Sequence, residues 1–269
     1  MTQAKQMKWI AGFWRRIGAL LIDSLILGVL GQILGLFFED YFVGLGGWGR
    51  LIGFSVALSY FGVMNSSVGN GQSIGKRILK IRVVNEFNDP ISIPQSVLRY
   101  VILSAPFLLN GAQLPDSFIL SIGGYVLSLI IFGGMLSIFY LYLFNRKTRQ
   151  SLHDLVSGTY VVNTRADFGL PESVWKPHYY IVGLICSASV LVPFFTGSLA
   201  DKEPFVGLLE TRNAIMERPD VTSAGVFYGT STFTSSSSGT RTTTYVSANV
   251  GLNENKIADE NLAGSIART

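Results

Sequence analysis

The sequence is poor in charge, cysteine and histidine. Only 14% of its 269 residues are charged, whereas a soluble domain normally carries about 25%. The single cysteine, Cys186, excludes a disulfide within the chain, and no cysteine and histidine cluster suggests zinc. His153 and His178 lack a nucleophile or a set of metal ligands. We therefore expect no enzyme, no cofactor and no metal site.

The basic excess is also small. A net charge of +4 is typical of a charge bias on one membrane face, not of a surface that binds nucleic acid. The N-terminus has Lys5 and Lys8, but the apolar run that follows is too long for a secretory signal and lacks a clear cleavage site. With a mean hydropathy of +0.39, the composition predicts a membrane protein without a cleaved leader.

Five apolar segments give the predicted framework of the chain. A helix needs about 20 apolar residues to cross a bilayer, and the first, fourth and fifth segments meet this need. The second and third are short, which leaves a re-entrant or interfacial placement open for one of them. The segments are Ile17–Phe38, Leu51–Met64, Val97–Leu109, Phe118–Phe144 and Tyr179–Gly197.

Lysine and arginine fall on alternate connections. The N-terminal stretch and the connections 65–96 and 145–178 are basic, whereas 39–50 and 110–117 together hold one arginine and three acids. Because basic connections stay on the cytoplasmic side, five crossings place the N-terminus inside and the C-terminus outside. We expect a multi-pass protein of the bacterial inner membrane.

The tail, residues 198–269, differs in character from the rest of the chain. Glu203–Glu217 has the apolar spacing of an amphipathic helix. Val221–Phe233 and Arg241–Leu252 flank a Ser-rich turn at Ser235–Gly239, which predicts a hairpin, and a last helix is expected within Asn255–Arg268. A hairpin alone is marginal, so we expect a small outward-facing α+β module with a protein partner; a partly disordered tail is the alternative.

The predicted fold is therefore an all-α membrane bundle with this small α+β module at its C-terminal end. We divide the chain into a membrane domain with four spans at 1–163, a connector and fifth span at 164–197, and the extracytoplasmic module at 198–269. A strip of Ser24, Gly28, Gly31 and Gly35 lies on one side of the first span. Such strips let helices approach closely, so we expect this one to pack against another helix.

Asp23 lies inside the first apolar run. An ionised carboxylate at the bilayer centre costs about 2.5–3.5 kcal/mol on insertion scales, so it needs a partner or a wet cavity. Arg16 lies two helical turns earlier on the same face. Two interpretations stay open: ion or substrate binding, or a structural pair that holds the bundle together.

A glycine-rich stretch, Gly69–Arg77, superficially resembles a phosphate loop. The match fails, since Asn70 stands at the first glycine position and Arg77 replaces the hydroxyl residue after the lysine. We interpret it as a turn that leads into a basic amphipathic segment, Ile74–Val84, on the cytoplasmic surface. The segment's basic side chains are expected to face anionic lipid, with a soluble anion as the alternative: Lys76, Arg77, Lys80 and Arg82.

A third polar motif, Arg149–Val162, follows the fourth segment on the same predicted side. His153 titrates in the range useful for proton relay, but a capped turn is the simpler interpretation. Asp154 is the stronger candidate because charge orientation places it on the same membrane side as Arg16. We predict that Arg16, Asp23 and Asp154 converge on one polar cluster near that side.

Three blocks together resemble the RDD family of bacterial multi-pass membrane proteins: Ala11–Asp23, Gly71–Val84 and Arg149–Thr159. The family is named for one arginine and two aspartates, which correspond here to Arg16, Asp23 and Asp154; Arg15 is the weaker match. The resemblance covers residues 9–162 and leaves out the fifth segment and the tail. It implies a membrane domain for which transport has been proposed, with sodium/proton antiport described for some members.

Two functions follow from these observations. In the first, the protein is a transporter or ion-coupled carrier, in which Asp23 binds a proton or cation and Arg16 tunes its affinity. Five spans offer few polar groups to line a pathway, so such a carrier is expected to be a homo-oligomer. In the second, the protein is a non-transporting scaffold or sensor in the bilayer that displays the outer module to a partner.

Overall fold

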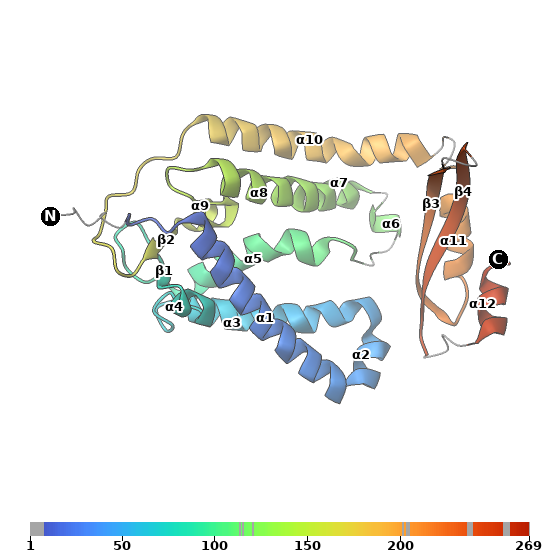
Figure 1. The fold of residues 1–269 in the computed structure, drawn as a ribbon, viewed down its shortest axis with the longest axis horizontal. Coiled ribbons are helices and arrows are strands. Elements are labelled where there is room, and N and C mark those ends of the chain that lie inside the picture. The colour runs from blue at the N-terminus through green and yellow to red at the C-terminus, as the bar shows by residue number, and fades with distance from the viewer. Residues whose placement is uncertain are drawn as a thin grey trace. The chain divides into compact units, whose positions relative to one another are not determined.

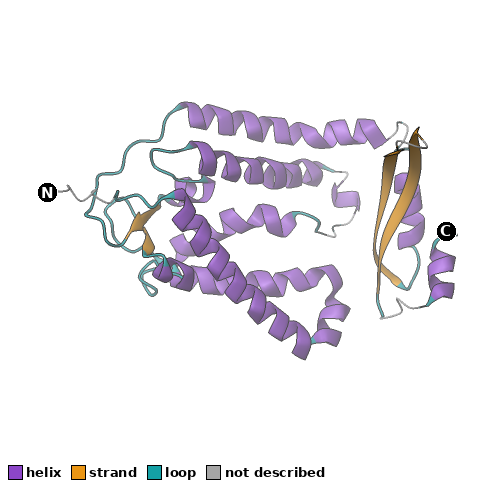
Figure 2. Ribbon diagram, viewed as in Figure 1, coloured by secondary structure: helices purple, strands orange, loops and turns teal. Residues whose placement is uncertain are grey.

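The computed structural model describes residues 8–112, 114, 116–119, 121–200, 202, 205–235, 239–254 and 259–268. Its elements are mostly helical (Figure 2). The chain divides into two compact units. The first holds Met1–Phe38 and Gly47–Val192, and the second holds Glu39–Gly46 and Pro193–Thr269.

The first unit is a set of apolar helices with short polar elements at one end (Figure 1). In Figure 1, α3, α5 and α8 lie side by side, and α1 runs at an oblique angle to them. The long elements are α1 (Phe13–Phe37), α3 (Arg50–Met64), α5 (Ile93–Leu109), α7 (Ile122–Ser128), the π-helical turn η2 (Leu129–Gly134), α8 (Met135–Phe144) and α10 (Pro177–Ala200). The short helices are α4 (Ile74–Ile78), α6 (Asp116–Ile119) and α9 (Leu152–Ser157).

Four helical stretches among the described residues are long and apolar enough to cross a membrane: Phe13–Phe37, Glu39–Met64, Ile122–Phe144 and Pro177–Leu199. The second joins α2 (Glu39–Leu45), a 3-10 turn (Gly46–Gly49) and α3. Four of the five expected spans thus have the required helix. The third forms α5, whose 17 residues fall short of the about 20 needed.

A two-stranded sheet at one end of the first unit corrects the expected surface helix. Only Ile74–Ile78 is helical, and Ile81–Val84 forms β1, which pairs antiparallel with β2 (Tyr160–Asn163). The chain turns between α4 and β1 at Lys80, whose φ of 56° is incompatible with a continued helix. The β-branched residues that follow pack into a small core around Ile81 and Val83, both with no exposed surface.

The second unit contains the expected hairpin. β3 (Val221–Ser235) pairs antiparallel with β4 (Gly239–Leu252), from Val221 opposite Leu252 to Ser235 opposite Gly239. Two short helices accompany it, α11 (Leu208–Met216) and α12 (Glu260–Ile266). The predicted turn residues 236–238 and the predicted helix starts at 203–204 and 255–258 lie outside the described residues. Among the described residues, α11 begins at Leu208, after the turn at 205–207 that the prediction had included in the helix, and α12 lies within the predicted range Asn255–Arg268.

The small-residue strip on α1 does not pack as expected. A methyl group added to Gly28, Gly31 or Gly35 would meet no atom of the described chain within 4 Å. Close packing occurs instead at Gly75, where a Cβ would lie 2.2 Å from the backbone oxygen of Ala19. The close approach to α1 is therefore made by α4.

Candidate functional site

Asp154 is held in place by the local fold of the third motif. Ser151 caps α9, and the Ser151 and Asp154 side chains each accept a hydrogen bond from the other's backbone N–H, which makes a capping box. Gly158 ends the helix with a left-handed φ of 62°. The Thr159 N–H then donates to the Asp154 carbonyl over 2.9 Å. The predicted capped turn is present, and within it the Asp154 side chain is buried.

Arg99 is the main partner of Asp154, and it was not among the residues predicted from the sequence. Its Nε and Nη2 atoms donate to Asp154 Oδ1 over 2.9 Å and 2.8 Å. Thr159 Oγ1 donates to the same oxygen over 3.1 Å. Arg99 is 7% exposed and Asp154 is 1% exposed. An arginine inside the third apolar segment was the available signal, since a buried charge requires a partner.

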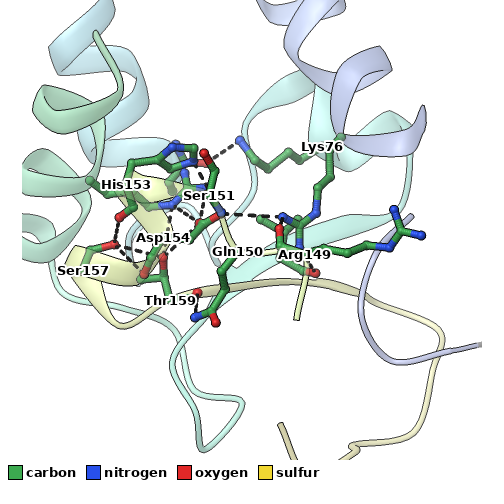
Figure 3. Close-up of polar contacts among 12 residues, drawn as sticks. Lys76, Arg149, Gln150, Ser151, His153, Asp154, Ser157 and Thr159 are labelled. Carbon is green, nitrogen blue, oxygen red and sulfur yellow. Dashed lines mark hydrogen bonds and ion pairs between the residues drawn. The ribbon is translucent and has the colours of Figure 1, made fainter. Parts of the chain in front are cut away.

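Arg16 approaches the other oxygen of Asp154. Its Nη1 atom lies 3.6 Å from Asp154 Oδ2. The same guanidinium donates to the backbone oxygens of Arg149 and Val161. Figure 3 shows Ser151, His153, Ser157 and Thr159 gathered around Asp154. The structure thus places two of the three predicted residues, Arg16 and Asp154, in one buried network.

Asp23 belongs to a different set of contacts. It is fully buried, and it accepts hydrogen bonds from the Tyr60 hydroxyl over 2.8 Å, the Ser73 hydroxyl over 2.5 Å and the Gly75 N–H over 2.8 Å. These donors come from α3 and from the start of α4. No ion pair joins Asp23 to Arg16 within the described chain, whereas Arg16 lies beside Asp154. The predicted single cluster is therefore two separate sets.

Lys76 corrects the expectation that all four basic side chains of its segment face lipid. It is half-buried, and Figure 3 shows it reaching from α4 towards the Asp154 network. Its Nζ donates to Asn65 Oδ1 over 2.8 Å and to Ser73 Oγ over 3.3 Å, and it lies 5.6 Å from the centre of the Phe61 ring. Of the other three basic residues, Arg77 and Lys80 are exposed.

The fourth residue, Arg82, is half-buried in β1, where its Nε has no hydrogen-bond partner among the described residues.

For Lys76, burial lowers the pKa to about 7. The charge of Arg99 acts in the same direction, and the charges of Asp23 and Asp154 oppose it. Lys76 therefore exchanges its proton near neutral pH, unlike an ordinary lysine.

Burial and neighbouring charges determine the charge states of the two titratable groups of α9, His153 and Asp154. Burial lowers the pKa of His153 to about 3, against the attraction of Asp154, so the imidazole is neutral at pH 7. Burial alone would raise the pKa of Asp154, but Arg99, His153 and Arg16 together, with the hydrogen bond from Arg99, outweigh burial and hold the pKa below its ordinary value. Asp154 is thus an ionised carboxylate, and His153, with Nε2 3.5 Å from Asp154 Oδ2, is a neutral neighbour.

A cavity of about 720 Å³ adjoins the network and lies within the first unit. Its polar end is formed by Arg16, Asn65, Lys76, Arg99, His153 and Asp154. Its remaining wall is mostly apolar and comes from α1, α5 and α8. Two of its lining side chains, Arg16 and His153, keep a nitrogen, Nε and Nδ1 respectively, that has no hydrogen-bond partner in the described part of the chain. No group of three metal-binding side chains occurs among the described residues.

Comparison with known proteins assigns the first unit. The model of the RDD family matches residues 10–158. An uncharacterized protein of Bacillus subtilis (strain 168), YckC, is 26% identical over 159 residues, which cover 56% of this chain and 83% of that protein. No solved structure gives a significant match. The chain therefore belongs to the RDD family, and its long apolar helices are those of an integral membrane protein.

Proposed function

We propose that this protein is a proton-coupled carrier of the bacterial inner membrane that binds its cargo in the cavity beside Asp154. The observation that carries the proposal is the cavity itself. Buried ionisable groups are rare in membrane helices and mark ion or substrate pathways, and here Arg16, Lys76, Arg99 and Asp154 share one wall of a space between helices.

The residues divide the work in this proposal. Asp154, with Arg99 and Arg16, fixes the polar end, because its hydrogen bonds and ion pairs keep it ionised at neutral pH. Asp23 ties α1 to α3 and to the start of α4 through three accepted hydrogen bonds, which suits an anchor better than a group that releases and takes up protons. Lys76 is the group that titrates near neutral pH. We therefore assign the coupling proton to Lys76 in place of Asp23.

An irregular helix beside the cavity supplies a place for movement. The π-helical turn η2 interrupts the fourth span between α7 and α8, and π-turns frequently occur at functional sites. A Cβ at Gly134 would lie 2.8 Å from Cγ of Pro106 in α5. The proline of α5 and the π-helical turn of the fourth span, both of which interrupt regular helix, thus touch each other. They lie next to the walls that α5 and α8 contribute to the cavity.

The experiment is flux in vesicles that contain the purified full chain. An internal pH-sensitive dye reports proton movement after gradients of sodium, potassium, phosphate or decylsulfonate are imposed. Lys76→Met is the test variant, and Arg77→Met, an exposed neighbour in the same helix, is its matched control. We expect proton movement with at least one solute, its loss in Lys76→Met and its retention in Arg77→Met. Folded wild-type protein that moves no proton with any solute contradicts the proposal.

A scaffold or sensor is the second candidate function. The second unit favours it, since its long hairpin and two short helices exceed what a carrier requires. In this case we expect no flux from the wild type, and deletion of 198–269 abolishes the cellular phenotype. A carrier, in contrast, keeps its flux in vesicles after the same deletion. We also propose that residues 198–269 bind a protein partner and that the chain forms a homo-oligomer in the bilayer.

A further inference from the structure

We propose that the cavity beside Asp154 binds an amphiphile with a single anionic head and an acyl chain, the head at Lys76 and the chain along α5 and α8. This inference rests on the proposed carrier function and names the class of its cargo. A free long-chain carboxylate and an anionic phospholipid share this chemistry.

The charge of the polar end selects the head group. Three cationic side chains, Arg16, Lys76 and Arg99, face one carboxylate, Asp154. Both arginines share that carboxylate, with nitrogen–oxygen distances of 3.6 Å for Arg16 and 2.8 Å for Arg99. Asp23 does not line the cavity. The wall therefore has an excess of positive charge, and a bound anion completes it.

Lys76 is the cation of this wall that has no acidic partner. Its Nζ contacts only neutral groups, the Asn65 amide and the Ser73 hydroxyl, together with the face of the Phe61 ring. No carboxylate of the described chain lies within 4.0 Å of it. A buried charge is normally paired, and a ligand carboxylate or phosphate provides that pair with a charge-assisted hydrogen bond.

The rest of the wall selects the tail. Away from Lys76 the cavity is lined mainly by aliphatic and aromatic side chains, among them Leu20, Leu27, Leu103, Phe107, Phe139 and Leu143. Ser104 offers no free donor to an anion, because its hydroxyl donates to its own helix at the Tyr100 carbonyl over 2.7 Å. A small hydrophilic anion would leave this surface uncovered. The volume of about 720 Å³ is in the usual range of ligand pockets, about 300–1,000 Å³, and has room for an acyl chain.

The binding test uses the full-length protein in nanodiscs of phosphatidylcholine, which has no net charge. A palmitate that carries a photoreactive diazirine on its chain is the probe, and mass spectrometry locates the labelled residues. Unlabelled palmitate, hexadecanol and acetate are the competitors, so that head and tail are tested separately. We expect labelling at Leu103, Phe107 or Phe139, and competition by palmitate but not by hexadecanol or acetate at equal concentration.

The variants test the head group. Lys76→Met weakens palmitate binding by about tenfold or more, since a hydrogen bond to a charged group contributes at least that factor. Arg77→Met, which changes the exposed neighbour of Lys76 in α4, leaves binding unchanged. If Lys76→Met does not fold, the competition by hexadecanol in wild type decides alone. Equal competition by hexadecanol, or labelling confined to the outer surfaces of α1 and α10, overturns the inference.

The two sources of the ligand are separated by a second set of nanodiscs that contain phosphatidylglycerol. Loss of palmitate labelling in these discs assigns the cavity to anionic phospholipid, and retained labelling assigns it to the free carboxylate. Binding without any flux contradicts the carrier and leaves the site standing. Flux without binding contradicts the site and leaves the carrier standing.

Discussion

Replacing Arg99 by methionine tests whether the buried ion pair holds the first unit together. Methionine keeps much of the apolar stem but removes the guanidinium. Asp154 Oδ1 then loses two hydrogen bonds, of 2.9 Å and 2.8 Å, and keeps only that of Thr159. The remaining cation, Arg16, is 3.6 Å from the other oxygen, too far to take over the lost pair without movement.

The expected loss of stability follows from these contacts. A hydrogen bond to a charged group contributes about 1.5–3 kcal/mol, so two of them give about 3–6 kcal/mol. Breaking a buried ion pair from one side costs about 3–5 kcal/mol, because a charge stays behind without compensation. We therefore expect Arg99→Met to lower the free energy of unfolding by about 3–5 kcal/mol.

The assay is a pair of double-mutant cycles on the free energy of unfolding in mild detergent. The first combines Arg99→Met with Asp154→Leu, and we expect the double variant to lose at least about 2 kcal/mol less than the sum of the single changes. The second combines Arg99→Met with Asp23→Leu. Since Asp23 belongs to the separate set of Tyr60, Ser73 and Gly75, we expect additivity within about 0.5 kcal/mol.

Acid provides an independent check on the same pair. The pKa of Asp154 is lowered from 3.8 in the folded protein, so its stabilisation is full above that ordinary value and is lost as the pH falls below it. Without Arg99 the pKa of Asp154 in the folded protein is less depressed, so we expect Arg99→Met to lose less stability on acidification than the wild type does. Additivity in the cycle with Asp154, or strong coupling in the cycle with Asp23, would refute the division into two sets.

Three further predictions concern packing, proton binding and orientation. Gly75→Ala destabilises the protein strongly because its Cβ meets a backbone oxygen of α1, whereas Gly31→Ala, in open space, is stabilising by up to about 1 kcal/mol; thermal unfolding compares them. Palmitate affinity falls between about pH 6 and about pH 8, where Lys76 with its pKa of about 7 loses its proton, and equilibrium binding to Lys76→Met shows no such fall. Reporter fusions at Gly71 and Ser236 give opposite sides of the membrane if basic connections are cytoplasmic, and a shared side contradicts five crossings.

The apolar runs were sufficient to predict the long helices. Four expected spans have helices of the required length, because burying a continuous apolar stretch in lipid leaves the backbone no better structure than a helix. The capped turn at Ser151 and the hairpin at 221–252 were predictable for a similar reason. Their signals are local, since each element is specified by residues within a few positions of one another.

Most of the site could not be predicted because its contacts join distant residues. Arg99 reaches an acid 55 residues away, and no local pattern records that pairing. Helical spacing correctly placed Arg16 and Asp23 on one face of α1, but it says nothing of what that face meets. Lys76 was misassigned because its partners, Asn65 and Phe61, lie in and next to α3, and the residues around Lys76 do not show that contact.

The anchoring of Asp23 has a consequence for how the protein is made. Its backbone donor, the N–H of Gly75, lies 52 residues later in the chain, and translation adds about 5–20 residues each second. For about 3–10 s the first helix therefore lacks the complete set of donors to its carboxylate, and an unpartnered carboxylate at the bilayer centre costs about 2.5–3.5 kcal/mol. We therefore expect the first helix to reach its full stability in the bilayer only after the loop that carries Gly75 has been made.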